Sequence, residues 1–229
     1  MVSPTFVLGP ENVPVPPGTA GNLFCRIINR GFFVWVFAKF SVSLVTCMAI
    51  ERWFAIARPN FYKITFTRRR VYAYIALMFF WNFGWVSQIL FEGKMEVIEG
   101  TPKCVFKQLI DNKAMAQVLV VMYCALTTFV PMLITLATYV HLRFVVMKQM
   151  KFINQTTAQR KRTQLETKLM RMSAVVAMAI GILFLPNQVA YILTKFDVYS
   201  YDEPINLQLV VLAMCNSFVN PWIYCFTNR

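Results

Sequence analysis

The sequence predicts an all-α fold: a polytopic membrane helix bundle that forms one domain over residues 1–229. The chain is 58% hydrophobic and 14% charged, whereas a soluble domain contains about 25% charged residues. Apolar stretches of about 20 residues, the length that a helix needs to cross the hydrocarbon layer, recur along the chain. We expect five spans, near residues 30–57, 71–91, 115–142, 169–195 and 205–227.

Some of these spans contain polar or helix-breaking residues. The first contains Lys39, and the third continues as a polar, basic extension through Lys151, so this helix should project beyond the bilayer. Pro131, Pro186 and Pro221 lie inside spans. Membrane helices tolerate proline because neighbouring helices satisfy the freed carbonyl groups.

The charged loops predict the orientation of the bundle. The loops after the first and third spans are strongly basic, and Glu166 is their one acid. The other loops balance acids against bases. The positive-inside rule therefore places the basic loops in the cytoplasm, with the N-terminus outside and the C-terminus inside. The one sequon, at Asn154, lies on the cytoplasmic side and should carry no glycan.

Composition and motifs disfavour several function classes. The net charge of +13 is concentrated in loops between apolar spans, unlike the exposed basic face of a nucleic-acid binder, so we expect no nucleic-acid partner. His141 is the one histidine, which excludes a histidine-based triad or a multi-histidine metal site. Common nucleotide-binding and hydrolase motifs are absent. We therefore expect no enzyme activity, cofactor or metal, and keep a membrane transporter or enzyme as a remote alternative.

Two cysteines fall on the predicted outer side of the membrane. Cys25 precedes the first span and Cys104 lies in the second outer loop. A disulfide persists in the oxidising environment there. The alternative, that all six cysteines are free, stays open from these residues alone.

Two charged positions in the first span need an explanation. Arg52 lies beside Glu51 at the cytoplasmic end, and a bridge from Arg52 to Glu166 would join two helix ends by a breakable contact, as in a switch. A snorkelling arginine without a special role is the alternative. Lys39 lies 13 residues earlier, about 20 Å along the helix axis. It could meet a ligand carboxylate, a backbone carbonyl or a water-filled cavity, or face a helix that is not among these five spans.

Three further motifs identify a family. Asn220-Pro-Trp-Ile-Tyr224 combines an amide, a proline and a tyrosine, Phe184 precedes Pro186, and Pro131 lies eight residues before Tyr139. Together with Glu51-Arg52-Trp53, they make the chain resemble the rhodopsin-like (class A) G-protein-coupled receptors. The resemblance implies that the five spans correspond to helices three to seven of a seven-helix receptor, with the first two helices lacking.

The resemblance also implies roles for individual residues. The expected disulfide is Cys25–Cys104, although Cys25 lies two residues further from Arg52 than is usual. Trp53 replaces the usual tyrosine, and Phe184 the usual tryptophan. The switch and G-protein coupling are expected to depend on Glu51, Arg52, Tyr139, Glu166, Phe184, Pro186, Asn220, Pro221 and Tyr224.

The family's ligand pocket opens outward. The expected pocket residues are Val34, Trp35, Ala38, Asn187, Gln188 and Tyr191. Because Val34 stands where amine receptors carry an aspartate, a monoamine is disfavoured. The alternation around Glu99-Gly100 predicts a β-hairpin, typical of the family's peptide receptors.

The resemblance thus implies a plasma-membrane receptor for an extracellular ligand, preferably a peptide, that activates a heterotrimeric G protein. The alternative is a truncated, non-signalling form that associates with full-length receptors.

Overall fold

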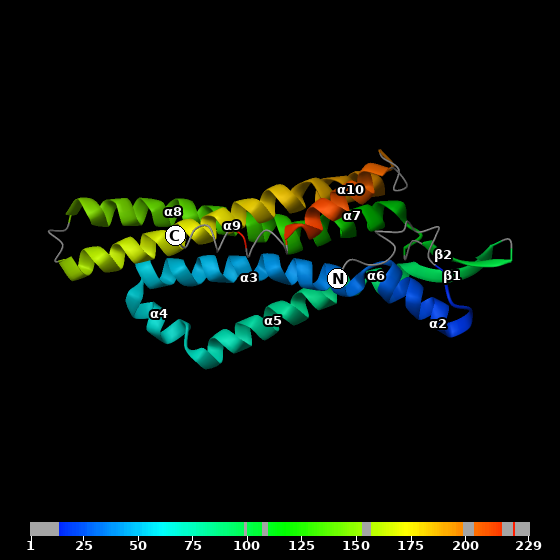
Figure 1. Ribbon diagram of the computed structural model, residues 1–229, viewed down its shortest axis with the longest axis horizontal. Helices are drawn as coiled ribbons and strands as arrows, with labels where there is room; N and C mark the ends of the chain where they lie inside the picture. The colour runs from blue at the N-terminus through cyan, green and yellow to red at the C-terminus, as the bar shows by residue number, and fades with distance from the viewer. Residues whose placement is uncertain are drawn as a thin grey trace.

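The computed structural model describes residues 14–98, 100–106, 110–152, 157–198, 204–216 and 222. Helices dominate it and run along its long axis (Figure 1). The first half contains α2 (Gly18–Leu23), the π-helix η1 (Phe24–Asn29), α3 (Phe32–Ala57), α4 (Pro59–Thr65), α5 (Arg68–Val86) and α6 (Ile89–Glu92). There follow β1 (Gly93–Ile98), β2 (Thr101–Phe106), α7 (Lys113–Cys124), the π-helix η2 (Ala125–Phe129), α8 (Val130–Phe152), α9 (Thr157–Lys195) and α10 (Pro204–Met214).

Four helical segments of the described chain are long and apolar enough to cross a membrane. They are Gly18–Ala57, Arg68–Glu92, Lys113–Lys148 and Arg171–Lys195. The chain is therefore an all-α membrane helix bundle. The predicted fifth span begins with α10, but most of its second half lies outside the described residues, so a fifth crossing stays a prediction.

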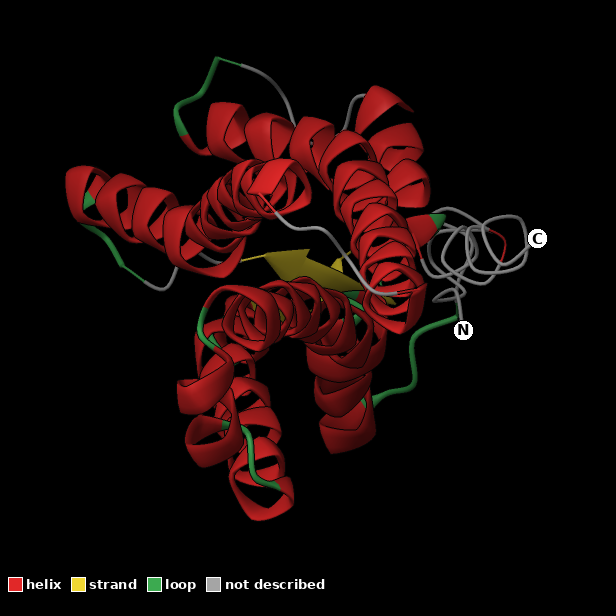
Figure 2. Cartoon of the chain, turned by 90° about the vertical axis from the view of Figure 1, so that its left-hand side faces the viewer, coloured by secondary structure: helices red, strands yellow, loops and turns green. Residues whose placement is uncertain are grey.

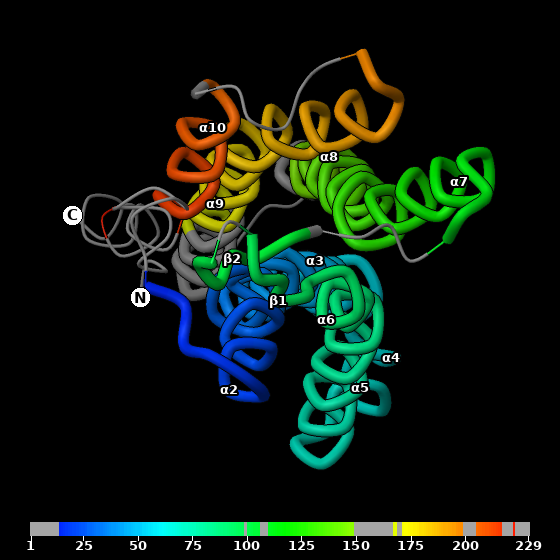
Figure 3. Tube along the Cα trace, turned by 90° about the vertical axis from the view of Figure 1, so that its right-hand side faces the viewer, coloured from blue at the N-terminus to red at the C-terminus, as the bar shows by residue number. Residues whose placement is uncertain are grey.

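Helix α3 occupies the middle of the bundle. It packs against α5 on one side and against α8 and α9 on the other, as the labelled view along the bundle shows (Figure 3). Figure 2 shows the bundle from its other end. Helices α7 and α10 pack on α9. The side chains of α3 therefore meet three different helices.

The helix that contains α3 begins earlier than the predicted start at residue 30. It runs back to Gly18 through η1 and is interrupted at Gly31, whose φ of 60° lies in the left-handed region. Glycine adopts that conformation without the steric penalty of a Cβ atom. Helix α9 likewise begins earlier than predicted, at Thr157 rather than near residue 169. The prediction followed the apolar stretch, and the first turns of α9 are polar and lie outside it.

The predicted hairpin is present. Strands β1 and β2 pair antiparallel, with Met95 opposite Cys104, and Gly100 turns with a φ of 76°. The hairpin lies over the middle of one end of the bundle (Figure 3), which we call the hairpin end. The opposite end, which carries α4 and the close of α8, is called the basic end.

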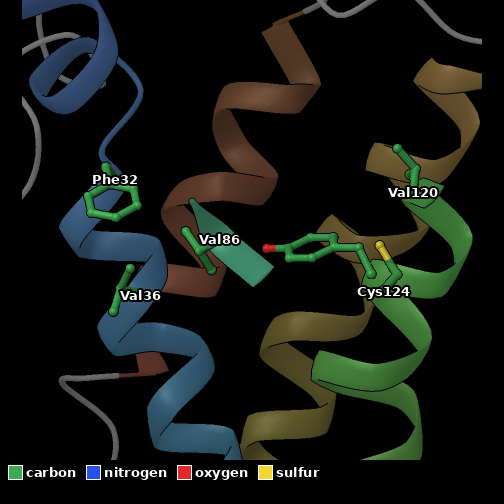
Figure 4. Packing of buried hydrophobic residues seen from close by; sticks show 6 residues of the cluster. Phe32, Val36, Val86, Val120 and Cys124 are labelled. Carbon is green, nitrogen blue, oxygen red and sulfur yellow. The ribbon is translucent and has the colours of Figure 1, made fainter. Parts of the chain in front are cut away.

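Two apolar clusters form the core. The first joins α3, α5 and α7 near the hairpin end through Phe32, Val36, Val86, Val120, Tyr123 and Cys124 (Figure 4). The second joins α3 and α9 through Val42, Val45, Val176, Ile180 and Phe184. On α3, the short interval between the clusters contains Lys39.

Candidate functional site

Lys39 lies in the interior of the bundle with no exposed surface. Its ammonium group donates to Thr128 Oγ1 and to Gln188 Oε1, each at 2.5 Å, and lies 5.0 Å from the centroid of the Tyr123 ring. These contacts join α3 to η2 and α9. They satisfy two of the three N–H groups, but no described acid neutralises the charge.

Local backbone structure positions the two acceptors. Thr128 belongs to η2, and a π-helical turn shifts the side chains that follow it relative to a regular helix; such turns are frequent at functional sites. Gln188 donates from Nε2 to Asn187 Oδ1 at 3.1 Å, which leaves its carbonyl oxygen directed at Lys39. Because Asn187 and Gln188 are both buried, this arrangement belongs to the packed interior.

The other expected pocket residues lie around this cluster. Val34, Trp35 and Ala38 are half-buried on α3, and Trp35 packs against both apolar clusters. Tyr191 makes an edge-to-face contact with Tyr123, with ring centroids 6.2 Å apart. Sequence reasoning missed Tyr123 and Thr128 as neighbours of Lys39, because a position on one helix does not indicate which partner helix it faces.

Covalent and ionic contacts hold the hairpin end together. Cys25 and Cys104 form a disulfide that joins η1 to β2, with Cα atoms 5.5 Å apart. Glu92 accepts from Arg30 at 3.2 Å and lies 3.7 Å from Lys195 Nζ. One carboxylate thus links the start of α3, α6 and the end of α9, above the Lys39 cluster.

At the basic end, Glu51 is the centre of a small polar network. Arg52 Nε lies 3.2 Å from one carboxylate oxygen of Glu51, and the Tyr62 hydroxyl donates to the other at 2.8 Å. The hydrogen bond to Glu51 raises the pKa of Tyr62 above its usual value. Tyr62 therefore stays neutral at physiological pH, and the bond is lost only as pH rises through that elevated pKa.

A second contact at this end joins α3 to α8. The Trp53 indole donates from Nε1 to His141 Nδ1 at 2.8 Å. The tryptophan that replaces the family's tyrosine thus keeps a polar partner on a neighbouring helix. The bond requires an unprotonated Nδ1, because a doubly protonated imidazole has no acceptor.

The structure places only some of the expected switch residues. Phe184 is buried in the second apolar cluster, Tyr139 is buried on α8, and Pro186 lies inside α9. The side chain of Glu166 lies outside the described residues, as do Asn220, Pro221 and Tyr224. The expected bridge from Arg52 to Glu166 therefore stays a prediction, and the ion pair seen for Arg52 is the one with Glu51.

The described residues contain no group of three or more His, Cys, Asp or Glu side chains that could hold a metal ion. What the arrangement offers is a buried cation with neutral acceptors near mid-span, a cross-linked cap at one end, and a breakable ion pair at the other. Such an arrangement suits binding and conformational change.

Comparison with known proteins agrees with this description. The model of the family described as 7 transmembrane receptor (rhodopsin family) matches residues 15–224. The substance-K receptor of Mus musculus is 26% identical over 215 residues, which cover 91% of this chain and 55% of the receptor. A rhodopsin of Mizuhopecten yessoensis described as GQ-coupled is 25% identical over 225 residues, covering 91% and 43%.

The adenosine receptor A2b of Canis lupus familiaris is 26% identical over 212 residues, which cover 86% of this chain and 64% of the receptor. The chain thus spans about half the length of the curated relatives that it matches first. Because the family model matches nearly the whole sequence, the chain belongs to the rhodopsin family of seven-transmembrane receptors.

Proposed function

We propose that this chain senses an extracellular ligand at the hairpin end and activates a heterotrimeric G protein at the basic end. The observation that carries the proposal is the Glu51–Arg52 ion pair at 3.2 Å. It lies at the end of the central helix α3, which also carries Lys39. A ligand-induced shift of α3 or α9 would therefore reach both ends. The relatives are receptors, which agrees with the expectation that the chain is not an enzyme.

A peptide is our preferred ligand class. The hairpin resembles that of the family's peptide receptors, α3 has no acid before Glu51 to hold an amine, and three of the relatives are substance-K receptors. The relatives named for adenosine make a nucleoside the competing class. Binding of a labelled peptide panel, with adenosine as competitor, would separate the two: displacement by adenosine alone contradicts the peptide.

The switch is tested by two substitutions in a version of the chain preceded by the first two helices of a relative. Arg52→Ala should abolish G-protein activation, because it removes the cation of the proposed switch. Glu166→Ala should raise basal activation several-fold. It would remove a resting-state contact of roughly 0.5–1 kcal/mol, and 1.4 kcal/mol corresponds to a tenfold change in an equilibrium constant.

The measurement is nucleotide exchange on purified G protein at matched surface expression. Glu96→Ala is a suitable control, since Glu96 is exposed at the hairpin end, where it pairs with Lys94. Basal activity that stays unchanged in the Glu166 variant would count against the resting-state bridge, and full activity of the Arg52 variant would contradict the coupling role.

The orientation is tested by glycosylation. Asn154 should stay unmodified in cells, whereas a sequon engineered near Lys113, far enough from the membrane to be reached, should gain a glycan. Lys113 pairs with Asp197 at the hairpin end, which we propose is extracellular. An endoglycosidase shift that disappears on Asn154→Gln would overturn the orientation.

A non-signalling partner of full-length receptors is the second candidate. Asn216 is 3% exposed and its Oδ1 makes no hydrogen bond within the described residues. An unsatisfied polar group in hydrocarbon costs several kcal/mol, so association with a second polypeptide would be favoured where it rearranges this helix and gives the buried oxygen a donor. Retention of the 229-residue chain in the endoplasmic reticulum, relieved by a co-expressed receptor, would support this candidate. Efficient surface display with G-protein activation by the chain alone would exclude it.

A further inference from the structure

A cavity of about 1070 Å³ lies between α3, α8 and α9 in the half of the bundle toward the basic end. Aliphatic side chains and methionines form most of its wall. Leu133, Leu136 and Met178 line it and are nevertheless 64%, 59% and 58% exposed. The cavity is therefore open sideways, through a surface that faces lipid in a membrane-spanning bundle.

The cavity extends from near the middle of the membrane to beyond the boundary of the hydrocarbon core at the basic end. Its deep end is lined by Phe129 and Leu185, which lie close to the midpoints of the candidate spans Lys113–Lys148 and Arg171–Lys195. Arg143 on α8 and Arg171 on α9 line the cavity 14 positions from these residues, and the lining extends about one turn beyond each arginine, to Met147 and Thr167. Fourteen helical residues span about 21 Å, whereas half of the hydrocarbon core is about 15 Å thick. Both arginines thus lie at headgroup depth.

The two arginines make this end of the cavity chemically distinct. They come from different helices, are both exposed, and form no ion pair with a described residue. A guanidinium group presents N–H donors in a planar fork that matches phosphate and carboxylate groups. An apolar groove that spans one leaflet, with two guanidinium groups near its end that pair with no acid in the described part of the chain, complements a molecule with a long hydrocarbon chain and an anionic head.

We propose that this cavity binds one acyl chain of an anionic phospholipid, with the headgroup against Arg143 and Arg171. The positive-inside orientation would place the site in the cytoplasmic leaflet, where anionic lipids are concentrated. Tyr139 also lines the cavity, so the bound chain contacts α8 beside an expected switch residue. The proposal does not depend on G-protein activation.

The test uses the complete 229-residue chain, purified in detergent and incubated with phosphatidylserine that carries a photoactivatable group on one acyl chain. Cross-links should map to α8 between Phe129 and Met147 and to α9 between Arg171 and Leu185. Phosphatidylcholine with the same chains should label these segments about thirtyfold less, because two arginines near a headgroup contribute roughly 1 kcal/mol each. Unlabelled phosphatidylserine should compete better than unlabelled phosphatidylcholine by a similar factor.

Two variants separate the headgroup from the chain. Arg143→Gln/Arg171→Gln should reduce phosphatidylserine labelling to the phosphatidylcholine level, whereas the control Arg68→Gln/Arg69→Gln should not. Ala177→Leu, which narrows the cavity, should reduce labelling by both lipids, whereas Ala76→Leu on the exposed face of α5 should not.

Folding of each variant is checked by circular dichroism. If a variant misfolds, the competition between the two unlabelled lipids for the unsubstituted protein still tests the proposal. Equal competition by the two lipids, or unchanged labelling of the arginine variant, overturns the headgroup contact. Cross-links confined to other helices, or labelling unaffected by Ala177→Leu, overturn insertion of the chain into the cavity.

Discussion

Replacing Cys25 by alanine should lower the free energy of unfolding in detergent by about 2–4 kcal/mol. The Cys25–Cys104 disulfide closes a loop with a sequence separation of 79, and the loop-entropy argument gives an upper figure of about 4.5 kcal/mol for that length. The bond also fastens the hairpin to η1. The expected result is a marked fall in the midpoint of thermal unfolding, followed by tryptophan fluorescence.

Three companion variants make this result specific. Cys104→Ala should destabilise as much as Cys25→Ala, and the double variant no more than either, because all three remove the same bond. Cys215→Ala should have little effect, since Cys215 is a free, exposed cysteine. A double variant much less stable than the single variants would show that the two cysteines contribute independently of the disulfide.

Replacing Lys39 by methionine should raise the free energy of unfolding by about 1–3 kcal/mol, and with it the midpoint of thermal unfolding. The lysine has no exposed surface and no acidic partner among the described residues, and taking an uncompensated charge out of water costs several kcal/mol. Two hydrogen bonds, typically 1.5–3 kcal/mol each when one partner is charged, offset part of this cost. Methionine keeps a long, flexible, apolar side chain in the same space.

The polar groups that remain can satisfy each other, so removing the lysine leaves no buried acceptor without a donor among these groups. Thr128 Oγ1 already lies 3.5 Å from Gln188 Oε1, so the threonine hydroxyl can donate to that oxygen once the ammonium is gone. Adding Thr128→Val to Lys39→Met should therefore destabilise, whereas Lys148→Met, an exposed control on α8, should change little. A fall in unfolding midpoint for Lys39→Met alone would mean that the charged bonds outweigh burial.

The sequence predicted the positions of the apolar parts of the helices, but not where their polar ends begin. Hydropathy reports the hydrocarbon layer, so it located the apolar half of α9 but gave no sign of the polar turns that begin at Thr157. The start of the first helix was missed for a different reason: the break at Gly31 depends on a left-handed backbone conformation, which one glycine in a sequence does not reveal.

Pairing between distant residues was the harder part of the site. Lys39 stood out as a buried charge, but its contact with Thr128 depends on how η2 rotates the following turns. Adjacent positions on a helix point about 100° apart, so we expected Glu51 and Arg52 to form an ion pair with poor geometry. Their long side chains nevertheless bring Arg52 Nε within 3.2 Å of the carboxylate. Tyr62, the second partner of Glu51, lies on a short helix that hydropathy does not detect.

The carboxylate shared at the hairpin end has a consequence for how substitutions combine. Glu92 serves both Arg30 and Lys195, so loss of one cation leaves the acid to the other, whereas loss of Glu92 removes both ion pairs at once. Changes at Arg30 and Lys195 are therefore not additive. Either cation can be replaced in evolution while the other keeps its pair with Glu92, whereas loss of Glu92 costs less in a background that has already lost one cation, so the order of the mutations matters.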